Sequence, residues 1–285
     1  MLETVDLTIR FGGHVAVDHV SCRFEAGTLT SIVGPNGAGK TTYFNLVSGQ
    51  LPAGEGRVRL AGEDITALPA PLRTRRGLGR AFQLTQLFPN LSAEENVRLA
   101  VQAREQGRGR GGVPAWLGGI DLWRVWLDHR AWTDEARAML EQVRLADKAA
   151  LPVAALPHGD QRKLEVALLM ALDPKVYMFD EPTAGMSVDE VPVVLDLIRA
   201  LKSRKDRCIL LVEHKMDVVS ELSDRIVVLH NGRLVADGEP RAVIASPIVQ
   251  QAYLGAVGAE TGAPAEPVGA PSRPSPAERG RSRHV

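Results

Sequence analysis

Apolar residues recur along the chain in short runs that are rich in β-branched side chains. The clearest runs are residues 28–33, 175–179, 208–212 and 225–229. The middle runs are continuously apolar, which is typical of central strands covered on both faces. Segments with helical periodicity lie between the runs, as at residues 161–172 and 191–201. This alternation of strands and helices predicts an α/β fold with a mainly parallel sheet.

Two further patterns add antiparallel structure to this expectation. Residues 1–13 alternate between apolar and polar side chains and carry acidic residues, so we expect an N-terminal β region and no signal peptide. Asn231-Gly232 lies between two apolar stretches, which is a strong signal for a tight β-hairpin.

A different pattern occupies residues 91–156. It is helical, is broken at the glycine-rich segment 107–119, and contains all four tryptophans, which are Trp116, Trp123, Trp126 and Trp132. We interpret it as a helical subdomain, at about residues 89–160, that is inserted in a main domain of residues 1–255. Residues 256–285 are rich in Pro, Ala and Arg and have almost nothing to bury, so we expect a disordered tail. Its basic end is compatible with weak attraction to anionic lipids or with a merely solubilising role.

Charge and composition narrow the function classes. The chain has 285 residues, with 34 basic and 34 acidic side chains. A net charge near zero argues against a nucleic-acid binder that relies on bulk electrostatics. The two cysteines have no metal-ligand spacing, and no apolar run is long enough to span a membrane. We therefore expect a cytoplasmic protein.

A phosphate-binding loop follows the predicted strand 28–33. The segment reads GPNGAGKTT and matches G-x-x-x-x-G-K-[ST] in its strand–loop–helix context. Its glycines let backbone N–H groups surround a phosphate, Lys40 can reach the β- and γ-phosphates, and the Thr41 hydroxyl can ligate Mg²⁺. The predicted nucleotide-binding residues here are Gly34, Pro35, Asn36, Gly37, Ala38, Gly39, Lys40, Thr41 and Thr42.

Carboxylates for nucleotide hydrolysis follow the buried run 176–179. Asp180 is suited to hold the Mg²⁺ shell, and Glu181 is suited to orient and deprotonate an attacking water. His214 follows another core strand, where it can contact the γ-phosphate and the water, although a lone histidine there is more often structural. Gln83 can report γ-phosphate or Mg²⁺ occupancy to a neighbouring loop. The sequence thus predicts ATP and Mg²⁺ as ligands, with Thr41, Gln83 and Asp180 at the metal.

Taken together, these motifs resemble the ATP-binding cassette (ABC) family over residues 2–255. The resemblance implies a P-loop, RecA-like ATPase core with a helical subdomain. It also implies two cassettes packed head-to-tail, with each ATP between the phosphate loop of one and the signature turn of the other. By the same resemblance, Phe11 matches the aromatic residue that stacks on adenine, Gln83 the loop glutamine, Glu181 the general base and His214 the switch histidine.

Two positions depart from the family pattern. The signature turn, usually Leu-Ser-Gly-Gly-Gln, here reads LPHGD at residues 156–160, so Pro157 replaces the serine hydroxyl. Backbone N–H groups at Gly159, with His158 as a further donor, are then the predicted phosphate ligands. Ser187 stands where the loop after the catalytic glutamate normally has aspartate. Because Ser187 and Glu190 have capping-box spacing, we interpret the serine as a helix cap.

Within the family, the likeness is greatest to ATPase subunits of branched-chain amino acid uptake transporters. It rests on segments such as RFGGHVAVDHVS, RAFQLTQLFPNLSAEENV, EPTAGMSVDE and SPIVQQAYLG. This likeness implies an ATP-hydrolysing, energy-coupling subunit located at the inner face of the membrane. It also implies two transmembrane permease subunits, a second ATPase subunit, identical or merely similar, and a periplasmic binding protein as partners, with no nucleic acid.

Alternative functions remain open at this point. Importers of urea and short amides share much of the pattern. A soluble ABC ATPase acting on ribosomes or DNA would usually carry two cassettes or a long coiled coil, and a P-loop kinase would not explain Glu181, His214 and the signature turn together. The tryptophans either pack the core of the helical subdomain or form an exposed edge that binds the membrane subunits or the other ATPase.

Overall fold

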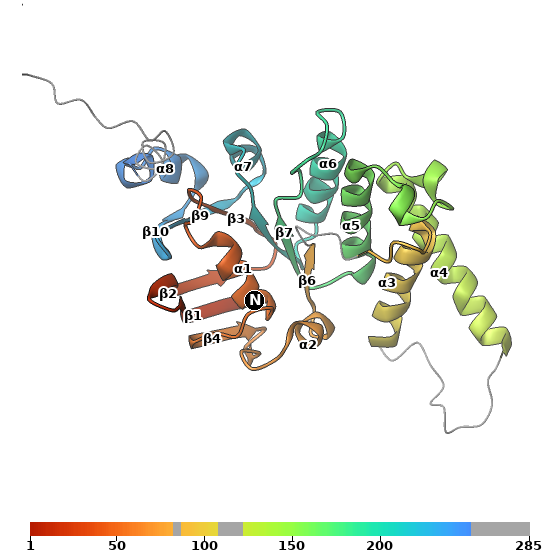
Figure 1. Cartoon of the computed structure of the whole chain (residues 1–285), viewed down its shortest axis with the longest axis horizontal. Coiled ribbons are helices and arrows are strands. Elements are labelled where there is room, and N and C mark those ends of the chain that lie inside the picture. The colour runs from red at the N-terminus through yellow and green to blue at the C-terminus, as the bar shows by residue number, and fades with distance from the viewer. Residues whose placement is uncertain (82–86, 108–121, 252–285) are drawn as a thin grey trace, which may run out of the picture.

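The computed structural model describes residues 1–81, 87–107 and 122–251. The strands within this part form a four-stranded and a six-stranded sheet (Figure 1). They are β1 (Leu2–Phe11), β2 (His14–Phe24), β3 (Leu29–Val33), β4 (Glu55–Leu60), β5 (Glu63–Asp64), β6 (Leu78–Ala81), β7 (Val176–Asp180), β8 (Cys208–Val212), β9 (Arg225–His230) and β10 (Arg233–Gly238).

The six-stranded sheet has the order β10-β9-β3-β8-β7-β6. Every neighbouring pair from β9 to β6 is parallel, and only β10 runs antiparallel to its neighbour. Strands β3, β7 and β8 are buried along their whole length, because helices cover both faces of the sheet. The sequence-based prediction of an α/β fold with a mainly parallel sheet is confirmed, and the expected antiparallel N-terminal region is the second sheet, β2-β1-β4-β5.

Helices connect these strands and cover the parallel sheet. They are α1 (Lys40–Ser48), α2 (Ala70–Arg75), α3 (Ala93–Gly107), α4 (Leu122–Gln142), α5 (His158–Leu172), α6 (Val191–Lys202), α7 (Met216–Leu222) and α8 (Pro240–Ile244), with 3₁₀ helices at Ala146–Lys148 and Val153–Ala155. Helix α1 lies between the two sheets (Figure 1), where Phe44 and Leu46 share a core with residues of β1, β2, β3, β7 and β8.

Helix α5 packs on the opposite face of the parallel sheet from α1. Along β7, Met178 belongs to the core around α1, whereas Tyr177 and Phe179 belong to the core that contains α5 and α6. This division follows from strand geometry, since successive side chains point to opposite faces. Helices α3 and α4 then pack against α5 and extend away from the sheet (Figure 1).

The tryptophan cluster is described only in part. Trp132 is partly buried and packs against the core of α3, α4 and α5. Trp116 and the side chains of Trp123 and Trp126 lie outside the described residues, as does the tail 256–285. The choice between a core role and an exposed edge for the cluster therefore stays a prediction.

Local signals in the sequence had mixed outcomes. Asn231 and Gly232, both with positive φ, connect β9 and β10, which confirms the predicted hairpin. Helix α5 begins at His158, directly after Pro157 and one residue before the expected start near Gly159. Ser187 does not cap α6, whose N-cap is Glu190; its N–H and hydroxyl donate instead to the Glu190 carboxylate and close the turn before the helix. The contact from the Glu190 carboxylate back to the Ser187 N–H that the capping box predicts is therefore present, but α6 begins at Val191, three residues later than such a box would start it.

Both cysteines are free and buried, and burial raises the pKa of the Cys22 thiol to about 11 and that of Cys208 to about 12.

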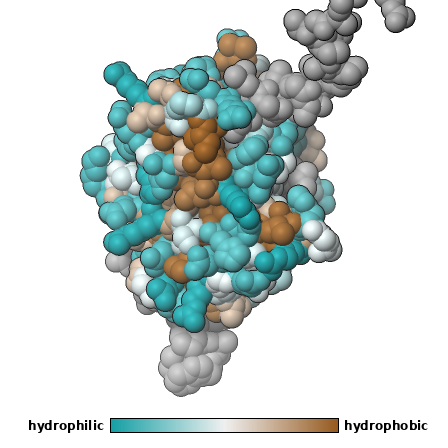
Figure 2. All heavy atoms as spheres, turned by 90° about the vertical axis from the view of Figure 1, so that its left-hand side faces the viewer, coloured by the Kyte–Doolittle hydropathy of each residue, from teal (hydrophilic) through white to brown (hydrophobic). Residues whose placement is uncertain are grey.

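Helices long and apolar enough to cross a bilayer are absent from the part of the chain that is described. Figure 2 shows a hydrophobic band on the face of the molecule that carries β2, β10 and α8.

Candidate functional site

The phosphate loop is shaped by glycines that lie against neighbouring backbone. It leaves the carboxyl end of β3 and leads into α1. A Cβ on Gly34 would lie 2.1 Å from the carbonyl oxygen of Leu229, and one on Gly39 would lie 2.4 Å from that of Ala16. Gly39 also has a φ of 97° as the N-cap of α1. Only glycine fits these two positions, so the loop is held in one curved path between β9 and β2.

The N-terminus of α1 opens into this loop. The Tyr43 N–H donates to the Gly39 carbonyl at 2.8 Å, which leaves the N–H groups of Lys40, Thr41 and Thr42 ahead of the first intrahelical bond. Acidic side chains are absent from the first turn, so the positive end of the helix dipole is not neutralised locally. Thr41 is exposed at this turn. The arrangement is that of an anion site.

Lys40 is held inside the loop. Its Nζ donates to the carbonyl oxygens of Gly34 at 2.7 Å and Pro35 at 3.0 Å. Burial lowers the pKa of the ammonium group, and the charges of Glu181 and Asp180 oppose that shift. The lysine thus lies close enough to both carboxylates to interact with them, which joins the phosphate loop and the end of β7 in one site.

Asp180 ends β7 as a fully buried carboxylate. Its Oδ2 accepts a hydrogen bond from Nη2 of Arg80 at 2.6 Å, whereas its Oδ1 is buried without a hydrogen-bond partner. An unpartnered buried carboxylate oxygen is costly unless a ligand satisfies it. Mg²⁺ prefers oxygen ligands, keeps several waters and is usually held by one or two carboxylates together with substrate phosphates. Asp180 Oδ1 and the Thr41 hydroxyl oxygen are ligands of the kind that Mg²⁺ prefers.

Glu181 and His214 meet above the sheet edge. Strands β7 and β8 are paired at Asp180 and Val212, and the Glu181 N–H donates to the Val212 carbonyl at 2.9 Å. Glu181 takes a φ of 49°, which is unusual for a residue with a side chain. Its Oε1 lies 2.7 Å from Nε2 of His214. The two residues that the sequence nominated for water activation are therefore hydrogen-bonded to each other.

Two residues of this site were missed by reasoning from the sequence. Arg80, next to Asp180, follows a glycine in an otherwise apolar strand, and nothing in that pattern shows that its guanidinium turns inward. Glu213 is buried and accepts hydrogen bonds from the Thr183 hydroxyl and from the His214 N–H, the latter at 2.9 Å. A charged residue at the end of a continuous apolar run was the one available signal for Glu213.

The signature turn forms the start of α5. Pro157 is the N-cap with a φ of −55°, and the Gln161 N–H donates to its carbonyl at 3.0 Å. His158 is exposed, whereas Gly159 is buried against Glu190: a Cβ on Gly159 would lie 2.2 Å from the Glu190 carboxylate. Because α1 and α5 cover opposite faces of the parallel sheet, the sheet lies between the helix that carries this turn and the helix that follows the phosphate loop.

The remaining predicted residues lie at the margin of the site or outside it. Phe11 is 50% exposed at the β1–β2 hairpin, whose strand β2 contacts Gly39 through Ala16. An exposed ring beside the loop is available for stacking. Gln83 lies outside the described residues.

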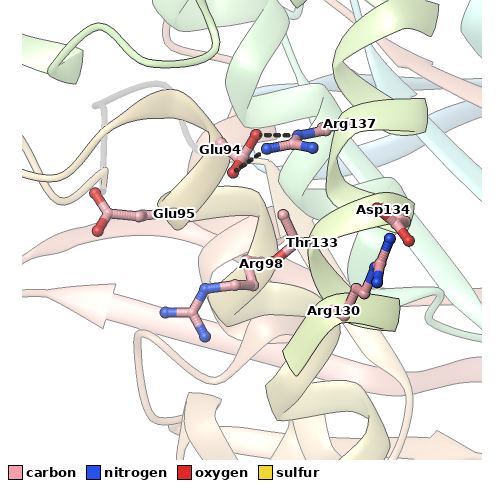
Figure 3. Close-up of a pocket in the computed structure, with 7 residues that line it drawn as sticks. All are labelled: Glu94, Glu95, Arg98, Arg130, Thr133, Asp134 and Arg137. Atoms are coloured by element: carbon pink, nitrogen blue, oxygen red, sulfur yellow. Dashed lines mark hydrogen bonds and ion pairs between the residues drawn. The ribbon is translucent and has the colours of Figure 1, made fainter. Parts of the chain in front are cut away.

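A separate pocket of about 520 Å³ lies between α3 and α4. Figure 3 shows that its lining mixes acidic and basic side chains, with an ion pair between Glu94 and Arg137 at 2.6 Å. It contains none of the predicted site residues and no glycine-rich loop. This pocket is therefore not the candidate nucleotide site, which is defined by the phosphate loop and by the carboxylates at the end of β7.

Comparison with known proteins agrees with this geometry. The chain is 38% identical over 256 residues to the high-affinity branched-chain amino acid transport ATP-binding protein BraF of Pseudomonas aeruginosa. The aligned region covers 90% of this chain and 98% of the relative. It is 35% identical over 259 residues to LivG of Escherichia coli, a protein of the same description, with coverages of 90% and 98%. A solved ATP-binding cassette of an ABC transporter in its ADP conformation superposes with a TM-score of 0.70 at 26% identity, over 90% of this chain and 98% of that one.

The family model described as ABC transporter matches residues 17–184, which is more than half of the chain. The matched region runs from β2 to the turn after Glu181 and so includes the phosphate loop, Asp180, Glu181 and the start of α5. The chain therefore belongs to the ABC transporter family, as one of its ATP-hydrolysing ATP-binding cassettes.

Proposed function

We propose that this chain is the energy-coupling ATPase of a membrane ABC importer for branched-chain amino acids. The observation that carries the substrate class is the 38% identity to BraF along nearly the full length of both proteins. The proposed partners are two transmembrane permease subunits, a second ATPase subunit and a periplasmic binding protein. The proposed location is the cytoplasmic face of the membrane, where the chain is held by these subunits.

The residues of the site divide the reaction between them. The N–H groups of the loop and Lys40 bind the β- and γ-phosphates of ATP, and Phe11 stacks on the adenine. Thr41, Gln83 and Asp180 hold Mg²⁺, which neutralises charge on the phosphates when it is bound. Glu181 takes a proton from the attacking water, and His214, 2.7 Å away, keeps that carboxylate in place. Gly159 and His158 serve the γ-phosphate bound by the other ATPase subunit.

The experiment that tests this function is transport by the reconstituted complex. The chain is purified together with the proposed membrane subunits and binding protein and placed in proteoliposomes. We expect ATP-dependent uptake of labelled leucine, and loss of both uptake and ATP hydrolysis in Glu181→Gln with ATP binding retained.

Competition identifies the substrate class. Excess isoleucine or valine is expected to suppress leucine uptake, whereas urea and acetamide leave it unchanged. Uptake of urea or an amide in place of leucine would move the proposal to the related class of importers. ATP hydrolysis that is unaffected by Glu181→Gln would overturn the assignment of the general base.

A further inference from the structure

Arg80 is a buried arginine that connects the end of β7 to α1. It lies on β6, which pairs in parallel with β7 and places Arg80 opposite Met178. Its side chain is 5% exposed and that of Asp180 is 0% exposed. Nη2 donates to Asp180, while Nη1 donates to Asn45 Oδ1 at 2.7 Å and to Ser48 Oγ at 3.0 Å.

The guanidinium is held in place from several directions. Asn45 and Ser48 belong to the helix that follows the phosphate loop, and the Phe44 ring of the same helix lies 5.5 Å from the Arg80 Cζ. A planar guanidinium with this many fixed partners has little rotamer freedom left. Its position, and with it the position of the Asp180 oxygen that it binds, is therefore set by α1.

The contact divides the two oxygens of Asp180. Oδ2 accepts a hydrogen bond from the guanidinium, and Oδ1 is left buried without a hydrogen-bond partner. A buried ion pair often contributes little net stability compared with apolar residues of the same size, because both charges lose their hydration. Fold stability alone is therefore a weak explanation for the buried Arg80–Asp180 ion pair. Orientation of Asp180 Oδ1 explains why a guanidinium lies at this position.

We propose that Arg80 is a positioning residue that orients Asp180 so that Oδ1 faces the Mg²⁺ of the bound nucleotide. This rests on the proposed function, in which Asp180 serves the metal. Arg80 does not touch the nucleotide. It acts as outer-shell partners of metal ligands do, by fixing the ligand in one orientation before the metal arrives.

Arg73 provides a matched control. It is also buried and also binds α1, with Nη1 donating to the carbonyl oxygens of Leu46 and Val47 at 2.7 Å each. The Arg73 guanidinium donates to the backbone carbonyl oxygens of Leu46, Val47, Thr66 and Leu68 and not to Asp180. Arg73→Met and Arg80→Met therefore both remove a buried guanidinium beside the same helix, and only one of them removes a partner of Asp180.

The test measures equilibrium binding. A fluorescent ATP analogue is titrated into the purified chain at a series of Mg²⁺ concentrations, and Mn²⁺ binding to the nucleotide complex is followed by electron paramagnetic resonance. We expect Arg80→Met to raise the Mg²⁺ concentration for half-maximal binding by roughly 10- to 100-fold, as loss of an outer-shell partner does, with metal-free nucleotide binding unchanged. Arg73→Met should lower the melting temperature and leave the Mg²⁺ dependence as in the wild type.

Two milder variants keep the test decisive if Arg80→Met does not fold. Arg80→Lys retains the charge but not the fork of donors, and Asn45→Ala removes one anchor of the guanidinium; both are expected to shift the Mg²⁺ dependence in the same direction by less. If the folded variants had the same Mg²⁺ dependence as the wild type, the role of Arg80 would be purely structural. If they bound Mg²⁺ more tightly than the wild type, Arg80 would compete with the metal for Asp180. Either result overturns this proposal while leaving transport by the wild type, and so the proposed function, intact.

Discussion

Pro157 is the residue at which this cassette departs most from the family pattern. A proline at the N-cap has neither a hydroxyl nor an N–H to offer a phosphate. Its carbonyl still accepts the first intrahelical bond from Gln161, and its φ of −55° fits the entry into α5. We therefore predict that phosphate binding by this turn depends on the N–H groups of His158 and Gly159, which come after the proline.

Replacing Pro157 with serine tests how much the missing hydroxyl matters. We expect Pro157→Ser to preserve or raise the ATPase rate of the assembled transporter, because serine adds a donor and is a preferred N-cap, worth about 1 kcal/mol of stability. Steady-state hydrolysis and thermal unfolding are the measurements. Pro157→Ala, which removes the ring without adding a hydroxyl, is the control. A large loss of activity in both variants would show that the site uses the shape of the proline.

Glu213 links two elements at the catalytic edge of the sheet. It follows β8, accepts from the Thr183 hydroxyl in the loop after β7, and accepts from the His214 N–H at 2.9 Å and the Lys215 N–H at 3.4 Å. Since Glu181 and His214 come from these same two loops, the Glu213 carboxylate fixes the separation at which they can meet. It does this without reaching the nucleotide.

Removing the Glu213 carboxylate should therefore affect the chemical step more than binding. We expect Glu213→Leu to lower kcat by roughly 10- to 100-fold, the usual effect of small misplacement, with the KM for ATP nearly unchanged. The donors left without this acceptor, above all the buried Thr183 hydroxyl, should cost about 2 kcal/mol of stability. Glu213→Gln keeps an acceptor and should fall between Glu213→Leu and the wild type. An equal loss of ATP affinity would contradict a positioning role.

Elements were easier to predict from the sequence than the contacts between them. The buried run at Cys208–Val212 has the predicted limits, because continuous apolar residues bounded by charges leave little choice. The start of α5 at His158 lies close to the predicted start near Gly159, because the proline before it determines the entry into the helix even though His158, Gly159 and Asp160 have weak helix propensity. Arg80 and Glu213 escaped prediction because their partners lie 100 and 30 residues away in the sequence.

At the scale of the whole molecule, the phosphate loop and the signature turn belong to helices on opposite faces of the parallel sheet. Helix α1 and the phosphate loop serve one face of the parallel sheet, and α5 with its signature turn covers the other. The parallel sheet therefore lies between the helix that follows the phosphate loop and the helix that begins with the signature turn. We propose that a second cassette packs head-to-tail against this one, so that each signature turn faces the phosphate loop of the partner.

This arrangement predicts that damage at the signature turn acts in trans. In a Glu181→Gln background, which keeps ATP bound, we expect Mg²⁺-ATP to drive association of the cassette with its partner ATPase, measured by sedimentation velocity. Adding Gly159→Asp should abolish this association, because its side chain displaces the Glu190 carboxylate, which would lie 2.2 Å from the new Cβ, and brings a second negative charge to the turn that faces the γ-phosphate of the partner, while ATP binding to its own phosphate loop persists. Lys40→Ala, which removes the phosphate-binding ammonium, is the control: it is expected to lose both ATP binding and ATP-driven association. If Gly159→Asp weakened ATP binding by the isolated, folded chain, the turn would belong to its own nucleotide site and the head-to-tail arrangement would be wrong.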